Sequence, residues 1–152
     1  MRTAAILPIK RFSRAKRRLG ASVAETLRLE LARAMVADVL LALSETEASE
    51  MTIVVTREPS VARAARRLGA VVIDDAAEAG QSAAAELGVR YAMLEGIERV
   101  LCVPGDCPAL DPLELEALLA TGSPGAARER EVVIVPDRHG TGTNGLMLSP
   151  PD

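Results

Sequence analysis

The chain has 152 residues, a formal net charge of -3, 49% hydrophobic residues and 26% charged residues. This length suits one domain, residues 1–152, rather than two. No apolar run approaches the roughly 20 residues that a membrane-spanning helix needs, so the composition excludes a membrane protein. The acidic net charge and an aromatic content of 1% exclude nucleic-acid modules that coat phosphates or stack bases on aromatic rings.

Short apolar runs alternate with helical patterns along the whole chain. The runs predict strands over residues 4–9, 51–56, 70–73, 99–103, 132–135 and 145–148. The spacing of leucine and alanine predicts helices over 23–43, 59–68, 82–94 and 112–120, the first opened by a capping box from Ser22 to Glu25. This alternation indicates an α/β fold, a largely parallel sheet with helices on both faces. Ligands bind such sheets beyond the carboxyl ends of the strands.

Positive charge is concentrated in the loop that follows the first strand. The chain has 16 arginines but only two lysines, Lys10 and Lys16, and seven positive charges precede the first acidic residue, Glu25. A lysine offers a compact ammonium charge, which suits phosphate. This loop is not a P-loop, because no Gly-x4-Gly precedes either lysine. The segment is therefore either a solvated basic face or, as we favour, a site for a small polyanion such as a nucleoside triphosphate.

Two further loops at strand ends carry candidate residues. Asp106, in Pro104-Gly-Asp-Cys-Pro108, follows a buried strand, where a carboxylate can hold Mg²⁺ on phosphate oxygens, although Pro-Gly-Asp is also an ordinary turn sequence. In the segment 136–146 the glycines match G-x-G-x-x-G, but the segment leads into a strand rather than a helix, so it is no dinucleotide fingerprint. It is either a Gly-rich hairpin loop or a phosphate cradle formed by Thr141, Gly142, Thr143 and Asn144.

The remaining candidates receive structural interpretations. Asp74 and Asp75 are adjacent, so in a strand they would point to opposite faces, and a strand-ending acidic turn explains them better than a metal pair. Cys102 and Cys107 are too few for a disulfide scaffold and lack the C-x-x-C spacing of zinc or redox sites, which indicates a reducing, cytoplasmic setting. Cys107 is expected to be a small packed residue.

Three motifs in order along the chain resemble the guanylyltransferases of coenzyme F-420 biosynthesis. They are Leu7-Pro-Ile-Lys10 with Ala15-Lys-Arg-Arg-Leu19, then Pro104-Gly-Asp-Cys-Pro108, and then Gly140-Thr-Gly-Thr-Asn-Gly-Leu146. The resemblance covers the whole chain and implies a Rossmann-like, GT-A-like nucleotidyltransferase sheet. It also implies transfer of GMP from GTP to 2-phospho-L-lactate or phosphoenolpyruvate, with release of pyrophosphate and with Mg²⁺ as the cofactor.

The resemblance also assigns residues. It makes Lys16 and Asp106 the catalytic groups, with Asp106 as the metal ligand. It assigns eight residues, Lys16 again among them, as ligands of the nucleotide and acceptor phosphates: Lys10, Arg11, Lys16, Arg18, Thr141, Gly142, Thr143 and Asn144. The chain departs from the family pattern at Gly80-Gln81-Ser82, where family members have Gly-Leu-Asn.

The family also continues into an acidic Asp-x-Asp segment, so we expect the domain to be truncated at its C-terminus. The expected partners are therefore GTP and a small phosphorylated three-carbon acid. A sheet edge left open where further strands belong would favour a homodimer. The alternatives are another nucleotidyltransferase of this fold, acting on a pterin cofactor or a sugar phosphate, and a non-catalytic nucleotide-binding fragment.

Overall fold

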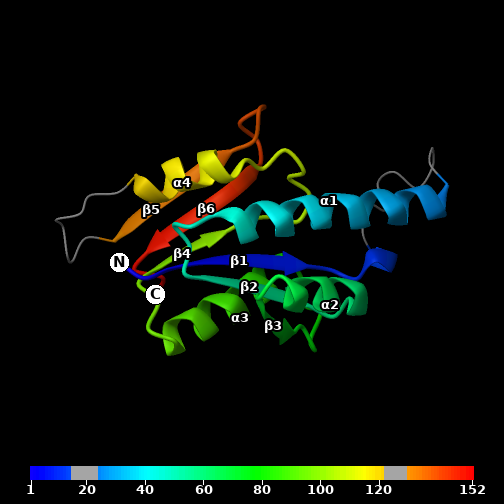
Figure 1. The fold of residues 1–152 in the computed structure, drawn as a ribbon, viewed down its shortest axis with the longest axis horizontal. Helices are drawn as coiled ribbons and strands as arrows, with labels where there is room; N and C mark the ends of the chain where they lie inside the picture. The colour runs from blue at the N-terminus through cyan, green and yellow to red at the C-terminus, as the bar shows by residue number, and fades with distance from the viewer. Residues whose placement is uncertain (15–23, 122–129) are drawn as a thin grey trace.

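A computed structural model of the chain describes residues 1–14, 24–121 and 130–152. Within them a six-stranded sheet has the order β3-β2-β1-β4-β6-β5 (Figure 1). Its strands are β1 (Thr3–Ile9), β2 (Met51–Thr56), β3 (Val71–Asp74), β4 (Arg99–Cys102), β5 (Glu131–Pro136) and β6 (Thr143–Ser149). β1 pairs in parallel with both β2 and β4, and β2 pairs in parallel with β3, which confirms the largely parallel sheet.

Helices cover both faces of the parallel part of the sheet, as the alternating pattern predicts. They are α1 (Glu25–Glu45), α2 (Pro59–Arg67), α3 (Gln81–Leu94) and α4 (Pro112–Ala120), with a short 3-10 turn, η1, over Phe12–Arg14. Buried residues of α1, α2 and α4 share one apolar cluster with one face of the sheet, whereas α3 packs in a second cluster on the other face. Proline at the first turn begins both α2 and α4, where its missing N–H costs no hydrogen bond.

The close packing of α3 depends on a helical glycine. A Cβ built on Gly88 would lie 2.5 Å from Cγ2 of Ile6 and 3.3 Å from Cγ2 of Val55. Ile6 and Val55 belong to the neighbouring strands β1 and β2, so the absence of a side chain at Gly88 lets the helix pack directly on the sheet. The loop from β3 into α3 is thereby held at the carboxyl edge of these strands.

The last two strands form an antiparallel hairpin that extends the sheet beyond β4. β6 pairs antiparallel with β4 and β5 pairs antiparallel with β6, so β5 is the outer strand. Val132 and Ile134 of β5 are each 59% exposed. Their partners in register, Leu148 and Leu146, are half-buried, and Leu148 packs in the same cluster as α3. The hairpin is therefore well covered only on its α4 side.

The start of α1 differs from the sequence prediction. The helix begins at Glu25 with Ala24, rather than Ser22, as its N-cap, and the Ala24 side chain makes no capping hydrogen bond. Ser22 itself lies outside the described residues. The other predicted helices and strands agree with the structure to within about two residues at each end, the usual scatter of element boundaries. None of the helices described is long and apolar enough to cross a membrane.

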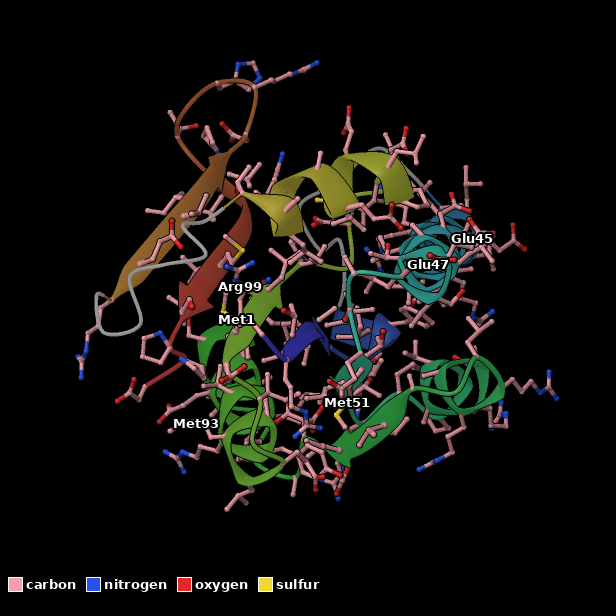
Figure 2. The ribbon with its side chains drawn as sticks, turned by 60° about the vertical axis from the view of Figure 1, so that its left-hand side comes forward. Met1, Glu45, Glu47, Met51, Met93 and Arg99 are labelled. Atoms are coloured by element: carbon pink, nitrogen blue, oxygen red, sulfur yellow. The ribbon has the colours of Figure 1, made fainter. Side chains whose placement is uncertain are left out.

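Both chain ends lie at the amino-terminal edge of the parallel strands (Figure 1). Figure 2 shows Met1, Met51 and Arg99 at this edge, near the starts of β1, β2 and β4. Arg99 is only 5% exposed, and its Nη1 donates to the backbone carbonyl of Leu119 over 2.6 Å, which ties the end of α4 to the start of β4. The opposite edge, where β1 to β4 end, carries the candidate site.

Candidate functional site

The loop after β1 brings two of the predicted cationic residues to the carboxyl edge of the sheet. Lys10 directly follows the buried strand and is exposed, and Arg11 comes next. The other two cations implied by the resemblance, Lys16 and Arg18, lie outside the described residues. Parallel sheets bind their ligands at this edge, so Lys10 and Arg11 lie where a phosphate site is expected.

Phe12 and Glu58 anchor this basic loop. Phe12 is 4% exposed within the core, and its backbone N–H donates to Oε2 of Glu58 over 3.1 Å. The backbone N–H of Glu58 in turn donates to Oγ1 of Thr56 at the end of β2. The guanidinium carbon of Arg33 lies 5.8 Å from the centre of the Phe12 ring. The loop after β1 is thus bound to the loop after β2, which limits the movement of Lys10 and Arg11.

A pocket of about 430 Å³ opens between the ends of β1, β2 and β3. Its size is within the roughly 300–1,000 Å³ of small-molecule sites. It has both cationic and anionic walls: its lining residues are Ile9, Lys10, Arg11, Arg57, Asp75, Glu78 and Gly80. A pocket lined in this way can hold a ligand that carries both negative charge and hydrogen-bond donors.

Four of these pocket residues were not predicted as site residues, and one of them, Asp75, was interpreted only as part of a strand-ending acidic turn. The four are Arg57, Asp75, Glu78 and Gly80. The predicted acidic turn is present, since the backbone N–H of Glu78 donates to the Asp75 carbonyl and to its Oδ1, each over 3.2 Å. The signal that could have identified Asp75 was its place directly after a strand that ends at the ligand-binding edge.

Asp106 reaches the same edge because the loop after β4 passes close to the end of β1. The segment after β4 passes over the end of β1, where a Cβ built on Gly105 would overlap Cδ1 of Ile9 and approach Cγ2 of Val36 to 3.4 Å. Only glycine allows this approach, which carries the exposed carboxylate of Asp106 to the end of β1, the strand that Lys10 follows. Cys107 packs against the core, as expected for a small packed residue.

The carboxylate, histidine and cysteine side chains of the described residues are the possible ligands of a metal ion. In residues 1–14, 24–121 and 130–152 no group of three His, Cys, Asp or Glu side chains is arranged to hold a metal. Mg²⁺, however, is commonly held by one or two carboxylates together with substrate phosphates and water. The single carboxylate of Asp106 at the carboxyl edge of the sheet therefore fits a magnesium ion whose other ligands are substrate phosphates and water.

The glycine-rich segment forms the loop of the β5–β6 hairpin, the simpler of its two interpretations. Oδ1 of Asp137 accepts the backbone N–H groups of His139 and Thr141 over 2.9 and 3.0 Å. These hydrogen bonds, with that of Thr141 first, hold the pKa of Asp137 below its usual value. One N–H group of the expected phosphate cradle, that of Thr141, is thus engaged within the loop, while the predicted side chains of Thr141, Thr143 and Asn144 are exposed.

Cys102 is not poised for nucleophilic chemistry. The thiol lies in β4 beneath the site, and burial raises its pKa to about 11. Because the thiolate is the reactive form, this thiol is neutral and unreactive near pH 7.

Known structures support the fold. A cytidylyltransferase from Leptospira borgpetersenii superposes with a TM-score of 0.66 at 14% identity, covering 98% of this chain and 60% of that one. A 4-diphosphocytidyl-2C-methyl-D-erythritol synthase gives a TM-score of 0.62 at 14% identity, covering 99% and 76% of the two chains. At these identities the likeness establishes a nucleotidyltransferase-type fold.

Sequence relatives are more specific. A phosphoenolpyruvate guanylyltransferase of Conexibacter woesei is 52% identical over 152 residues, which is all of this chain and 67% of the relative. Another, of Sphaerobacter thermophilus, is 35% identical over 152 residues, all of this chain and 70% of the relative. The chain thus spans about two thirds of the length of these relatives. Since residues 3–152 also match the family described as "Guanylyl transferase CofC like", the chain belongs to the CofC-like guanylyl transferases.

Proposed function

We propose that this chain binds GTP and transfers its GMP group to phosphoenolpyruvate, as in the coenzyme F-420 pathway that the motifs suggest. The observation that supports this most strongly is the mixed-charge pocket at the carboxyl edge of the sheet, in a chain 52% identical to a phosphoenolpyruvate guanylyltransferase. That relative's name favours phosphoenolpyruvate over 2-phospho-L-lactate as the acceptor. A cytoplasmic location accords with both proposed substrates, and residues 1–152 would form one nucleotidyltransferase domain.

The chemistry requires charge neutralisation and alignment. A phosphate oxygen of the acceptor attacks the α-phosphorus of GTP, the bond between the α-phosphorus and the bridging oxygen breaks, and pyrophosphate leaves. Lys10 and Arg11 follow β1 where they can hold the triphosphate, and Lys16 and Arg18 are proposed to extend this set. Positioned cations favour such a reaction because they offset the repulsion between two phosphate groups and stabilise the leaving group.

Asp106 is the proposed ligand for magnesium. A magnesium ion bound with the triphosphate would supply further neutralisation of phosphate charge. The role of this chain is to hold the carboxylate at the carboxyl edge, through the glycine crossing over Ile9. Thr141, Gly142, Thr143 and Asn144, in the hairpin loop, remain the proposed ligands of the nucleotide and acceptor phosphates.

Calorimetric titration in Mg²⁺ tests the nucleotide assignment. We expect GTP to bind at least 10-fold more tightly than CTP or ATP, and Lys10→Ala to weaken GTP binding about 10-fold because one charge-assisted contact is lost. Arg63→Ala, which removes an exposed cation on α2, is the matched control and should leave the affinity unchanged. A preference for CTP, or none at all, would instead support another nucleotidyltransferase.

The acceptor is tested by pyrophosphate release. The chain is incubated with GTP, Mg²⁺ and either phosphoenolpyruvate or 2-phospho-L-lactate, and pyrophosphate is measured over time. We expect release with phosphoenolpyruvate. GTP binding without release from any pairing would support the alternative of a nucleotide-binding fragment.

A further inference from the structure

We propose that Asp75 reads the guanine base and so makes the pocket selective for GTP. This inference rests on the proposed function, because it assigns a role to one residue of the same nucleotide site. The lining of the pocket is divided by charge: Lys10, Arg11 and Arg57 come from the loops after β1 and β2, whereas Asp75 and Glu78 come from the segment between β3 and α3. The acidic wall needs an explanation, since a carboxylate repels phosphate.

The acidic wall suits the donor-bearing end of a guanine nucleotide. Guanine presents N1–H and the amino group at C2 side by side, and these two donors match the two oxygens of a carboxylate. Adenine and cytosine place an unprotonated ring nitrogen beside their amino group, so one carboxylate oxygen would face a lone pair. A pocket carboxylate that meets the base therefore favours guanine over both.

Asp75 is held in place before any ligand binds. It is 5% exposed, its backbone N–H donates to the Thr56 carbonyl over 3.4 Å, and its Oδ1 accepts the backbone N–H of Glu78 over 3.2 Å. Glu78 has a φ of +43° and Gly80 a φ of +116°, which shape the turn around this carboxylate. One hydrogen bond uses one of about four acceptor positions, so the carboxylate retains the capacity for a bidentate contact.

The neighbouring carboxylates have other partners. Oε1 of Glu78 lies 3.0 Å from Nε of Arg11, which joins the acidic and basic walls of the pocket. Oδ1 of Asp74 lies 3.7 Å from Nε of Arg57, and the Asp74 side chain is 63% exposed and does not line the pocket. Of the three carboxylates at the end of β3 and in the loop after it, Asp75 is the buried one, so it is the best suited to bind a base.

Asp75→Asn provides a test with a gain of binding. The amide keeps one oxygen to accept N1–H but replaces the other with an NH2 donor, which suits the C2 carbonyl of xanthine. We expect Kd for GTP to rise about 10- to 100-fold and Kd for XTP to fall, so that the nucleotide preference reverses. Asp74→Asn makes the same chemical change outside the pocket and should keep the wild-type preference.

A second arm uses the unaltered protein, so it does not depend on how the variant folds. ITP lacks the amino group at C2, and we expect it to bind about 10-fold more weakly than GTP. Equal affinity for ITP and GTP, or an Asp75→Asn variant that still prefers GTP to XTP, would overturn the role of Asp75. Failure of the wild-type chain to bind GTP at all would overturn the proposed function instead, so the two failures are distinct.

Discussion

The carboxylate of Asp137 organises the loop between β5 and β6 from within. It accepts two backbone N–H groups of that loop, and a Cβ built on Gly142 would lie 2.8 Å from its Oδ2. The positive φ of 69° at Gly140 belongs to the same tight turn. The Asp137 carboxylate thus binds the loop N–H groups as an anion would in a backbone cradle. The predicted phosphate contacts of this loop are therefore left to its side chains.

Asp137→Ala should loosen this loop without unfolding the protein. We expect faster hydrogen exchange at the Thr141 amide, because that N–H loses its acceptor. In the wild type the pKa of Asp137 is lowered, so protection of this amide should be complete above pH about 4 and be lost as the pH falls through the folded-state pKa. NMR-detected exchange measures both effects, with the exposed Asp38→Ala as control. Unchanged protection in Asp137→Ala would contradict this account.

At the scale of whole elements, most of the fold is readable from the sequence. The apolar strands lie between proline, glycine and polar residues, and their buried pattern in β1 and β2 identifies them directly. The pairing order is not readable, because nothing local to β6 shows that it lies between β4 and β5. The pocket was missed for the same reason: Arg57, Asp75 and Glu78 meet only once β1, β2 and β3 are neighbours.

The close contact between Gly105, in the loop after β4, and Ile9, at the end of β1, predicts that a change at one position can compensate for a change at the other. Gly105→Ala should reduce the free energy of unfolding by about 1–3 kcal/mol, because the new methyl group overlaps Ile9 in a filled core. Ile9→Val removes the Cδ1 atom that is overlapped, so the double variant should be more stable than the sum of the two single changes predicts. Urea unfolding of the four proteins measures the coupling. Strictly additive effects would show that Gly105 and Ile9 do not constrain each other.

For the whole molecule, the outer strand β5 is the most exposed apolar feature of the described sheet. An uncovered edge strand invites pairing with another chain. We therefore expect concentration-dependent self-association through Val132 and Ile134, each 59% exposed. Replacing both with lysine should shift the light-scattering mass toward the monomer, whereas Leu113→Lys, at a leucine 73% exposed on α4, should not. A wild-type chain that stays monomeric at high concentration would contradict this expectation.

The position of β4 in the sheet also affects when the parts of the site can assemble during synthesis of the chain. Every residue that lines the pocket lies between positions 9 and 80, so all of the pocket residues are synthesised before β4. β1, however, is flanked by β4, and Asp106 follows β4, so the inner strand stays open on one side until residue 102 has emerged. Domains fold as units during synthesis, with N-terminal parts available first. The residues proposed to bind the base are therefore synthesised before Asp106, the proposed magnesium ligand, can take its place beside β1.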